Sequence, residues 1–298
     1  MKIVNFNQDR IGIVEGETIA DVSDVVDYDP VCWPPTGMLR LIASFDHIRE
    51  RIQVRLRSAE RIPLAKAKLN SPVAWPNKVI AYPANYRAHI DEMKTGIGLI
   101  STYNASGQGF FLKANSSLSG PADPIVLPAL PGREIHHECE LAIIIGKGGR
   151  GITRDRAVEH IFGYSCLIDV VIRGKEERVM RKSFDSFCPM GPWITTADEI
   201  HRYDDIDLEL SVNGERRQKA NTRDLIVDVP EMIAMASSVM TLYPGDIIAS
   251  GTPAGVGRLK DGDHVEICIA GVGTMKLDVN QGADGAHPLW NKAPAMTA

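Results

Sequence analysis

The chain has 298 residues, of which 44% are hydrophobic and 24% are charged. This length suits one large domain with a smaller one, and the composition is ordinary for a globular protein. A formal net charge of −5 argues against nucleic acid or an anionic membrane as the main partner. No apolar stretch approaches the length of a membrane span, and the N-terminus lacks the apolar segment of a signal peptide.

Residues 1–70 are predicted to form a small α/β module. Short strands at 3–6 and 11–14 precede a helix over 37–60, in which apolar residues recur at helical spacing. After a linker at 71–76, residues 71–298 change to short β-rich runs separated by glycine and proline, which predicts a larger, mainly β domain. The predicted fold class is therefore α+β, mainly β.

Other segments of the second domain carry weaker signals. A helix is expected over 154–162 with Thr153 as its cap, and another begins near Pro230. Residues 94–117 are rich in Gly, Ser and Asn and are predicted to form a mobile loop that acts as a lid. The chain from about residue 286 is expected to be a loosely held tail.

The five cysteines are an odd number, and no two of them have CxxC spacing. This usage indicates free thiols in a reducing compartment, so we expect a cytoplasmic protein. Cys139 and Cys166 lie in apolar runs and are expected to be small core residues. No local signature marks any of the five as a catalytic nucleophile.

Three acidic residues stand in or beside apolar, strand-like runs. Glu138 and Glu140 flank Cys139 and would share one face of a strand, because side chains alternate along it. Asp169 lies in the middle of a second apolar run, where an acid is costly to bury without compensation for its charge. A divalent cation would relieve the repulsion, and oxygen ligands suit Mg²⁺, Mn²⁺ or Ca²⁺ better than zinc. A solvated face of a half-exposed strand is the equally weighted alternative.

Further candidates become meaningful only together. His89 and Glu92 are neighbours if their segment is helical, and a carboxylate beside an imidazole suits a general base, although a chance surface pair is the simpler interpretation. Lys182 could supply positive charge to an oxyanion, and Arg173 could bind a substrate carboxylate, or either could be an ordinary surface or ion-paired residue. His136 would share the face of Glu138 as a ligand or, more in keeping with a hard ion, as a neighbour of the ligands.

Two glycine-rich segments have different interpretations. Residues 146–151 lack the Lys-Ser/Thr ending of a phosphate loop, so a tight turn after a strand is expected. In residues 244–257, Gly251 allows close approach of the backbone to a ligand and Thr252 offers a hydroxyl. A tight β-bend is the alternative for this second segment.

Taken together, residues 79–279 resemble the fumarylacetoacetate hydrolase family, in particular its bacterial branch of acylpyruvate hydrolases and 2-hydroxyhepta-2,4-diene-1,7-dioate isomerases. The blocks that carry the resemblance are Asn85-Tyr86 with His89 and Glu92, Phe111-Leu112-Lys113, the run His136 to Ala142, Asp169-Val170 with Arg173, Lys182 to Asp185, Val212 to Glu215, Asp228 to Glu231, and Pro244 to Gly257. The segment between Asp169 and Lys182 departs from the family by its short length and by Gly174-Lys175-Glu176.

The resemblance implies a mixed β-roll catalytic domain, in a homodimer, that acts on a small 2-oxo acid. It implies Mg²⁺ or Mn²⁺ on Glu138, Glu140 and Asp169, with Ca²⁺ as a substitute. It also implies that His89 and Glu92 activate water on a segment that orders with substrate, and that Lys182 and Thr252 face the oxo-acid head.

The reaction expected from this resemblance is hydrolytic C–C cleavage of an acylpyruvate such as fumarylpyruvate, through a pyruvate enolate. Decarboxylation of oxaloacetate and isomerisation of an unsaturated oxo-diacid remain open, because they need the same enolate stabilisation. A catalytically silent metal-binding protein is a third possibility, which the intact set of acids and the His89–Glu92 pair oppose.

Overall fold

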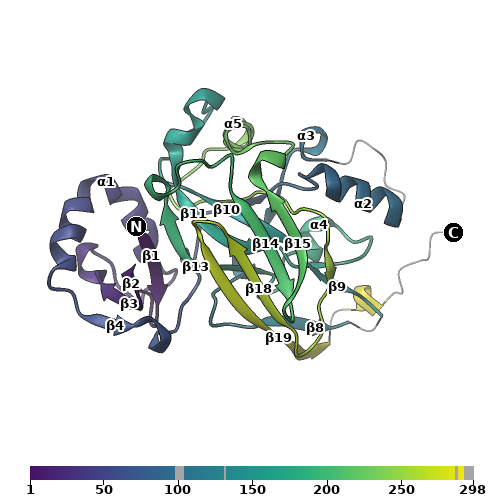
Figure 1. Ribbon diagram of the computed structural model, residues 1–298, viewed down its shortest axis with the longest axis horizontal. Helices are drawn as coiled ribbons and strands as arrows, with labels where there is room; N and C mark the ends of the chain where they lie inside the picture. Colours follow the sequence, from purple (N-terminus) through teal and green to yellow (C-terminus); the bar gives the residue numbers. More distant parts are fainter. Residues whose placement is uncertain (98–103, 131, 286–287, 292–298) are drawn as a thin grey trace.

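The computed structural model describes residues 1–97, 104–130, 132–285 and 288–291 (Figure 1). The described strands form sheets of eleven, five and three strands, so the fold is mixed and mostly sheet, as predicted. Within this described part of the chain, no helix is both long and apolar enough to cross a membrane. Cys139 and Cys166 are buried and free, which confirms them as core residues.

The N-terminal elements lie together at one end of the molecule (Figure 1). They are β1 (Lys2–Phe6), β2 (Arg10–Glu15), β3 (Thr18–Asp21), β4 (Arg61–Pro63) and the helix α1 (Gly37–Leu56). Leu41, Phe45 and Ile52 recur on one buried face of α1 and pack against Ile3 and Ile13 of the strands. The predicted helix is confirmed, although it ends at Leu56 rather than residue 60.

The large sheet continues from these strands into the rest of the chain. β1 pairs antiparallel with β13, which places Ile3 opposite Ile194. Beyond β13 the order is β11, β10, β16, β5 and β6, with β7 beside β13. Their bounds are β5 (Val79–Ala81), β6 (Phe111–Lys113), β7 (Leu118–Ser119), β10 (Cys139–Ile145), β11 (Ile161–Ile168), β13 (Cys188–Thr196) and β16 (Ile247–Ala249).

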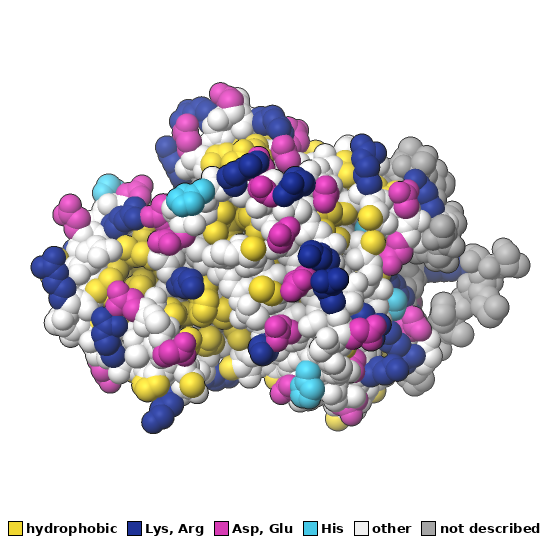
Figure 2. All heavy atoms as spheres, viewed as in Figure 1, with side chains coloured by type: hydrophobic (Ala, Val, Ile, Leu, Met, Phe, Trp, Pro, Cys, Tyr) yellow, Lys and Arg dark blue, Asp and Glu magenta, His cyan; other side chains and the backbone are white. Residues whose placement is uncertain are grey.

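A five-stranded sheet packs against the central strands β10, β11 and β13. Its strands are β8 (Ile125–Ala129), β14 (Asp207–Val212), β15 (Glu215–Asn221), β18 (His264–Ile269) and β19 (Gly273–Gly285). Alternate residues of β14, such as Leu208 and Leu210, are buried in one cluster with Leu141 and Ile143 of β10. The other face is polar, and Figure 2 shows positive and negative side chains interspersed over it.

Two helix predictions have different outcomes. Residues 154–160 form a 3-10 helix rather than an α-helix, and Phe162 already belongs to β11, because pairing of Ile161 with Ile145 begins the antiparallel ladder there. The other helix is confirmed as α5 (Val229–Val239), where the side chain of Asp228 accepts a hydrogen bond from the Glu231 N–H.

The lid predicted over 94–117 is partly wrong. Residues 94–97 end α2 (Arg87–Ile97), residues 98–103 lie outside the described part, and 105–108 form the short helix α3 (Ala105–Gln108). Phe111 to Lys113 form β6, which pairs with β5. The Gly, Ser and Asn residues on either side predict a loop for this stretch, but the strand pairing holds it in the sheet. Most of the predicted C-terminal tail also lies outside the described residues.

Candidate active site

Three buried carboxylates meet at one point beside β10. One ligand oxygen from each of Glu138, Glu140 and Asp169 lies within 4.8 Å of the others. Their side chains belong to residues that are 7%, 2% and 1% exposed respectively, which excludes the alternative of a solvated strand face. Three carboxylates at this separation need positive charge between or around them.

The pairing of β10 with β11 brings these acids together. Cys139 lies opposite Ile168, and the Asp169 N–H donates to the carbonyl of Glu138 at 2.9 Å. Glu138 stands between β9 (Ile135–His137) and β10, and Asp169 stands between β11 and β12 (Val171–Ile172). The expectation that Asp169 lies within a continuous strand is therefore wrong, because the ladder breaks at that residue and turns its carboxylate toward the other two.

Two buried lysines surround the acids, and only Lys182 was predicted as a site residue. The Lys182 ammonium lies 2.6 Å from Glu138 Oε2 and also contacts Asp169. Lys113 Nζ donates to Asp169 Oδ1 at 2.5 Å and to the carbonyls of Lys182 and Phe187 at 2.5 and 3.2 Å. Its apolar neighbours in β6 are the only local sign that Lys113 is buried.

The site divides its acids into different ionisation states. Burial opposes ionisation of Glu138, but the charges of Lys182 and Arg173 outweigh it and lower the pKa to about 2. Burial and the negative charge of Asp169 raise the pKa of Glu140 well above its ordinary value. Burial lowers the pKa of Lys182, but Asp169 and Glu138 more than offset it, so the lysine stays charged. Ionisation of the third carboxylate, Glu140, is therefore unfavourable here unless a further cation compensates for its charge.

His89 and Glu92 form the predicted pair on α2. His89 Nδ1 lies 3.0 Å from Glu92 Oε2, and the Gly255 N–H donates to Glu92 Oε1 at 3.0 Å. Burial raises the pKa of Glu92, but these two hydrogen bonds lower it below its ordinary value, so this acid is an acceptor only. Glu92 therefore holds the proton of His89 on Nδ1 and leaves Nε2 as the basic nitrogen.

A central hollow brings most of the predicted residues together. It is lined by the three carboxylates with His89, Arg173, Lys182 and Thr252, and by Phe111, Arg178 and Arg181, among others. Glu92 and Gly251 are not in its lining but act directly behind it. The Gly251 N–H donates to Glu140 Oε2 at 2.8 Å. At φ +88°, Gly251 also approaches Tyr82 and Asn85 so closely that a Cβ there would clash.

Arg173 and His136 occupy the rim near Glu138. Arg173 Nε donates to His136 Nδ1 at 3.0 Å, and its Nη1 lies 3.8 Å from Glu138 Oε1. His136 Nε2 lies 3.0 Å from a carboxylate oxygen of Glu134. His136 is thus a neighbour of the acids through Arg173, rather than a fourth member of the cluster, which among the described residues consists of the three carboxylates.

Comparison with known proteins identifies the family of this chain. Residues 78–280 match the family described as "Fumarylacetoacetate (FAA) hydrolase C-terminal". The chain belongs to the fumarylacetoacetate hydrolase family. It is 42% identical over 285 residues to the maleylpyruvate hydrolase of Aquipseudomonas alcaligenes, an alignment that covers 94% of this chain and 99% of that protein.

Solved structures of family members agree with this assignment. The maleylpyruvate hydrolase from Sphingobium sp. SYK-6, solved in complex with manganese(II) ion and pyruvate, is 52% identical with a TM-score of 0.86. The match covers 95% of this chain and 100% of that one. A probable 2-hydroxyhepta-2,4-diene-1,7-dioate isomerase from Mycobacterium abscessus is 29% identical with a TM-score of 0.77, over 95% of this chain and 99% of that one.

The donor set of this family member fits a hard divalent cation. All three candidate ligands are carboxylate oxygens, they converge within 4.8 Å, and they are buried against charged lysines rather than water. Oxygen-only ligation suits Mg²⁺ or Mn²⁺, which leave open positions for water or substrate. The triad can therefore bind such an ion.

Gln218 of β15 is a site residue that the sequence did not indicate. Its Oε1 accepts hydrogen bonds from the Cys139 N–H at 2.9 Å and from His137 Nδ1 at 3.0 Å. Its Nε2 donates to Thr252 Oγ1 at 2.8 Å and to the Pro253 carbonyl at 2.9 Å. One buried amide thus joins the strand that follows Glu138 to the loop that carries Thr252.

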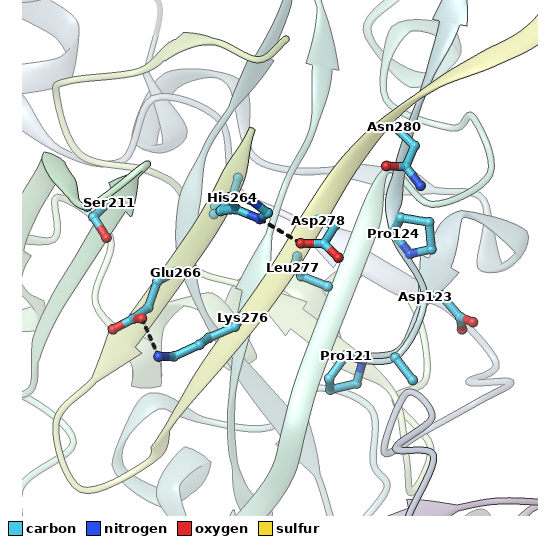
Figure 3. Close-up of a pocket in the computed structure, with 13 residues that line it drawn as sticks. Pro121, Asp123, Pro124, Ser211, His264, Glu266, Lys276, Leu277, Asp278 and Asn280 are labelled. Carbon is cyan, nitrogen blue, oxygen red and sulfur yellow. Dashed lines mark hydrogen bonds and ion pairs between the residues drawn. The ribbon is translucent and has the colours of Figure 1, made fainter. Parts of the chain in front are cut away.

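A second hollow lies on the exposed face of the five-stranded sheet, away from these acids (Figure 3). Its charged side chains pair across neighbouring strands, His264 with Asp278 at 2.7 Å and Lys276 with Glu266 at 3.0 Å. These are exposed cross-strand pairs, which stabilise a sheet modestly and contain no converging set of acids. The hollow with the converging acids is therefore the candidate active site.

Proposed function

We propose that the protein is a metal-dependent hydrolase that cleaves a C–C bond in a β-diketo acid of the acylpyruvate class. The observation that carries this proposal is the convergence of the buried triad and the His89–Glu92 pair on one hollow. The likeness to two maleylpyruvate hydrolases supports it, one of them solved with manganese and pyruvate. Maleylpyruvate and fumarylpyruvate are the substrates to test first.

Glu138, Glu140 and Asp169 would hold Mg²⁺ or Mn²⁺, with Ca²⁺ as a substitute. When bound, the ion supplies Lewis-acid stabilisation to the 2-oxo acid head and to the enolate formed from it. Thr252 would hydrogen-bond the head group through its hydroxyl proton, since its oxygen already accepts from Gln218. Arg173 would add positive charge at the Glu138 side of the head group, and Gly251 would let the backbone approach it.

His89 and Glu92 would perform the proton transfers. The basic Nε2 of His89 removes a proton from water, and Glu92 stabilises the imidazolium that results. The hydroxide adds to the carbonyl carbon of the acyl group. The bond from that carbon to the pyruvate CH₂ then breaks, and its electron pair stays on the pyruvate fragment as an enolate. Lys182 stabilises this charge, and the proton that His89 took from water passes to the enolate carbon, which gives pyruvate beside the released carboxylic acid.

The test is hydrolysis of acetylpyruvate, fumarylpyruvate and maleylpyruvate in the presence of Mg²⁺ or Mn²⁺. The release of pyruvate is measured with and without EDTA. We expect EDTA-sensitive cleavage. His89→Ala should lose at least about 100-fold in kcat while still binding Mn²⁺, and the exposed surface variant His264→Ala should retain activity. Turnover of oxaloacetate alone would instead assign a decarboxylase, and full activity in His89→Ala would remove His89 from the mechanism.

The same proposal extends to organisation. We place the catalytic residues in a domain of residues 71–298 preceded by a small module of residues 1–70. We also propose that the protein is a homodimer and that it is located in the cytoplasm. The free state of all five cysteines supports a reducing compartment. Light scattering of the purified protein tests the dimer.

A further inference from the structure

One buried tryptophan lies outside the residues that match the family. Trp290 belongs to the 3-10 helix Pro288–Asn291, beyond the matched residues 78–280. It is only 4% exposed and is part of an apolar core cluster. The ring of Phe184 meets it edge to face at 5.3 Å between centroids, and the Arg133 guanidinium carbon lies 5.4 Å from its centroid. The indole therefore bridges two segments that lie far apart in the sequence.

Arg133 is buried as well, and it holds the segment that follows β12. Its Nε and Nη2 donate to the Arg173 carbonyl at 3.1 and 3.0 Å. Its two terminal nitrogens also donate to the Glu176 carboxylate at 2.9 and 2.6 Å. A Cβ at position 174 would overlap the guanidinium, so Gly174 is what permits this pairing. One arginine thus holds both ends of residues 173–176, which include the departure from the family pattern.

The 173–182 segment supplies positive charge to the central hollow. Arg173 at its start and Lys182 at its end both line the hollow. Between them lies α4 (Arg178–Arg181), whose last side chain donates to the Glu176 carbonyl at 2.8 Å. Movement of the segment would therefore change the positions of both cations relative to the clustered acids.

The indole of Trp290 limits where the Arg133 guanidinium can lie. The Arg133 side chain is only 1% exposed. A planar guanidinium stacks favourably on an aromatic face, and exclusion of water strengthens its hydrogen bonds. Phe184 fixes the indole in turn, because the two rings meet at an interplanar angle of 64°. Without the indole, water would reach the guanidinium and compete for its bonds to Arg173 and Glu176.

We propose that Trp290 is a positioning residue, which through Arg133 holds the 173–182 segment where Arg173 and Lys182 act on the substrate. Trp290 is not among the described residues that line the hollow, so it acts only through these contacts. This rests on the proposed function, because it takes the two cations as the groups that meet the 2-oxo acid and its enolate.

The first measurement is amide hydrogen exchange by mass spectrometry on the metal-free protein, which needs no activity. Trp290→Leu keeps an apolar side chain but removes the ring beside Arg133. Peptides that cover residues 173–182 should exchange about 10-fold faster than in the wild type, whereas peptides from β14 should stay within about 2-fold. Phe45→Leu is the matched control, because Phe45 is also a buried aromatic residue with an edge-to-face partner, Phe162 at 5.0 Å, but lies in α1. It should leave the exchange of residues 173–182 within about 2-fold of the wild type.

The second measurement is turnover of acetylpyruvate with saturating Mn²⁺. Trp290→Leu should lose about 10- to 100-fold in kcat, because the groups that it positions are displaced. Trp290→Phe retains a ring face for the guanidinium and should keep kcat within about 3-fold of the wild type. Arg133→Met should lose kcat to a similar extent as Trp290→Leu. The double variant should lose no more than the worse single variant, because the two residues act as one unit.

Unchanged exchange of the 173–182 peptides in Trp290→Leu, full kcat in that variant, or additive losses in the double variant would each overturn the proposal. If circular dichroism shows that Trp290→Leu does not fold, Trp290→Met replaces it with the same expected results, because methionine adapts to an irregular core gap. Absence of any acylpyruvate turnover by the wild type refutes the proposed function, whereas the exchange measurement still decides whether Trp290 holds the segment.

Discussion

Replacing Gln218 with leucine should destabilise the protein, because this amide is the shared partner of four buried groups. Leucine has a similar size but leaves the Cys139 N–H, His137 Nδ1, Thr252 Oγ1 and the Pro253 carbonyl without it. A buried polar group that loses its partner costs about 1–3 kcal/mol. The Cys139 N–H and the His137 ring have the least freedom to find another partner, so we expect a loss of about 2–6 kcal/mol. That is a large share of a typical stability of about 5–15 kcal/mol.

The free energy of unfolding is measured by urea denaturation followed through tryptophan fluorescence. Gln281→Leu is the matched control, because Gln281 also donates to a backbone carbonyl, that of Leu127 at 2.8 Å, but from an exposed position. We expect a change within about 0.5 kcal/mol there. If Gln218→Leu loses no more than Gln281→Leu, the reasoning about the buried amide is refuted.

Gln218→Glu separates the stabilising role from the orienting one. Glutamate keeps the acceptor for Cys139 and His137 but replaces the Nε2 donor to both Thr252 and the Pro253 carbonyl with an oxygen. The Thr252 hydroxyl then turns to donate to that oxygen, which should raise KM for the acylpyruvate by about 2- to 10-fold with kcat changed by less than about 2-fold. A fall in kcat at constant KM would show that the hydroxyl acts in the transition state instead.

Lys113→Met should cost up to about 3–5 kcal/mol in urea unfolding, because it removes one of the two buried lysines that pair with Asp169, whereas the exposed Lys276→Met should cost under about 1 kcal/mol. Mn²⁺ at 100 times its Kd should raise the free energy of unfolding of the EDTA-treated, metal-free protein by about 3 kcal/mol. Glu140→Gln should reduce the corresponding rise in melting temperature. The hydrogen bonds from Arg133 lower the pKa of Glu176 below its ordinary 4.5, so its stabilising contribution is complete above that pH and is lost as pH falls through the folded-state value. The melting temperatures of wild type and Glu176→Gln should therefore converge on acidification from about pH 6 to about pH 3, and a constant gap would contradict this.

The three clustered acids were predictable, and so was their convergence, because strand alternation and the cost of burying a charge are local arguments. The backbone arrangement that produces the convergence was not, since it depends on the pairing of Cys139 with Ile168 and on a break in the ladder at Asp169. The His89–Glu92 pair was readable from its i, i+3 spacing, but its burial and its link to Gly255 were not.

The residues that the sequence missed have partners far along the chain. Lys113 lies 56 residues from Asp169, and Gln218 lies 81 residues from His137. Only the apolar neighbours of Lys113 hint at its burial, and Gln218 has no such sign, because a long polar side chain is marked as functional by what surrounds it in space. The predicted loop is wrong at residues 111–113 for the related reason that pairing of β6 with β5 outweighs the local composition.

Because β1 pairs with β13, removal of the first 70 residues would change the edge of the large sheet. Without them, β13 would present unpaired backbone N–H and C=O groups along one side. The apolar cluster shared by Ile3, Leu41 and Ile194 would also be opened to water. Such an edge is a template for joining other chains, so a shortened protein that retains every catalytic residue would aggregate. The smallest fragment that contains the chemistry is thus shorter than the smallest fragment that stays monodisperse.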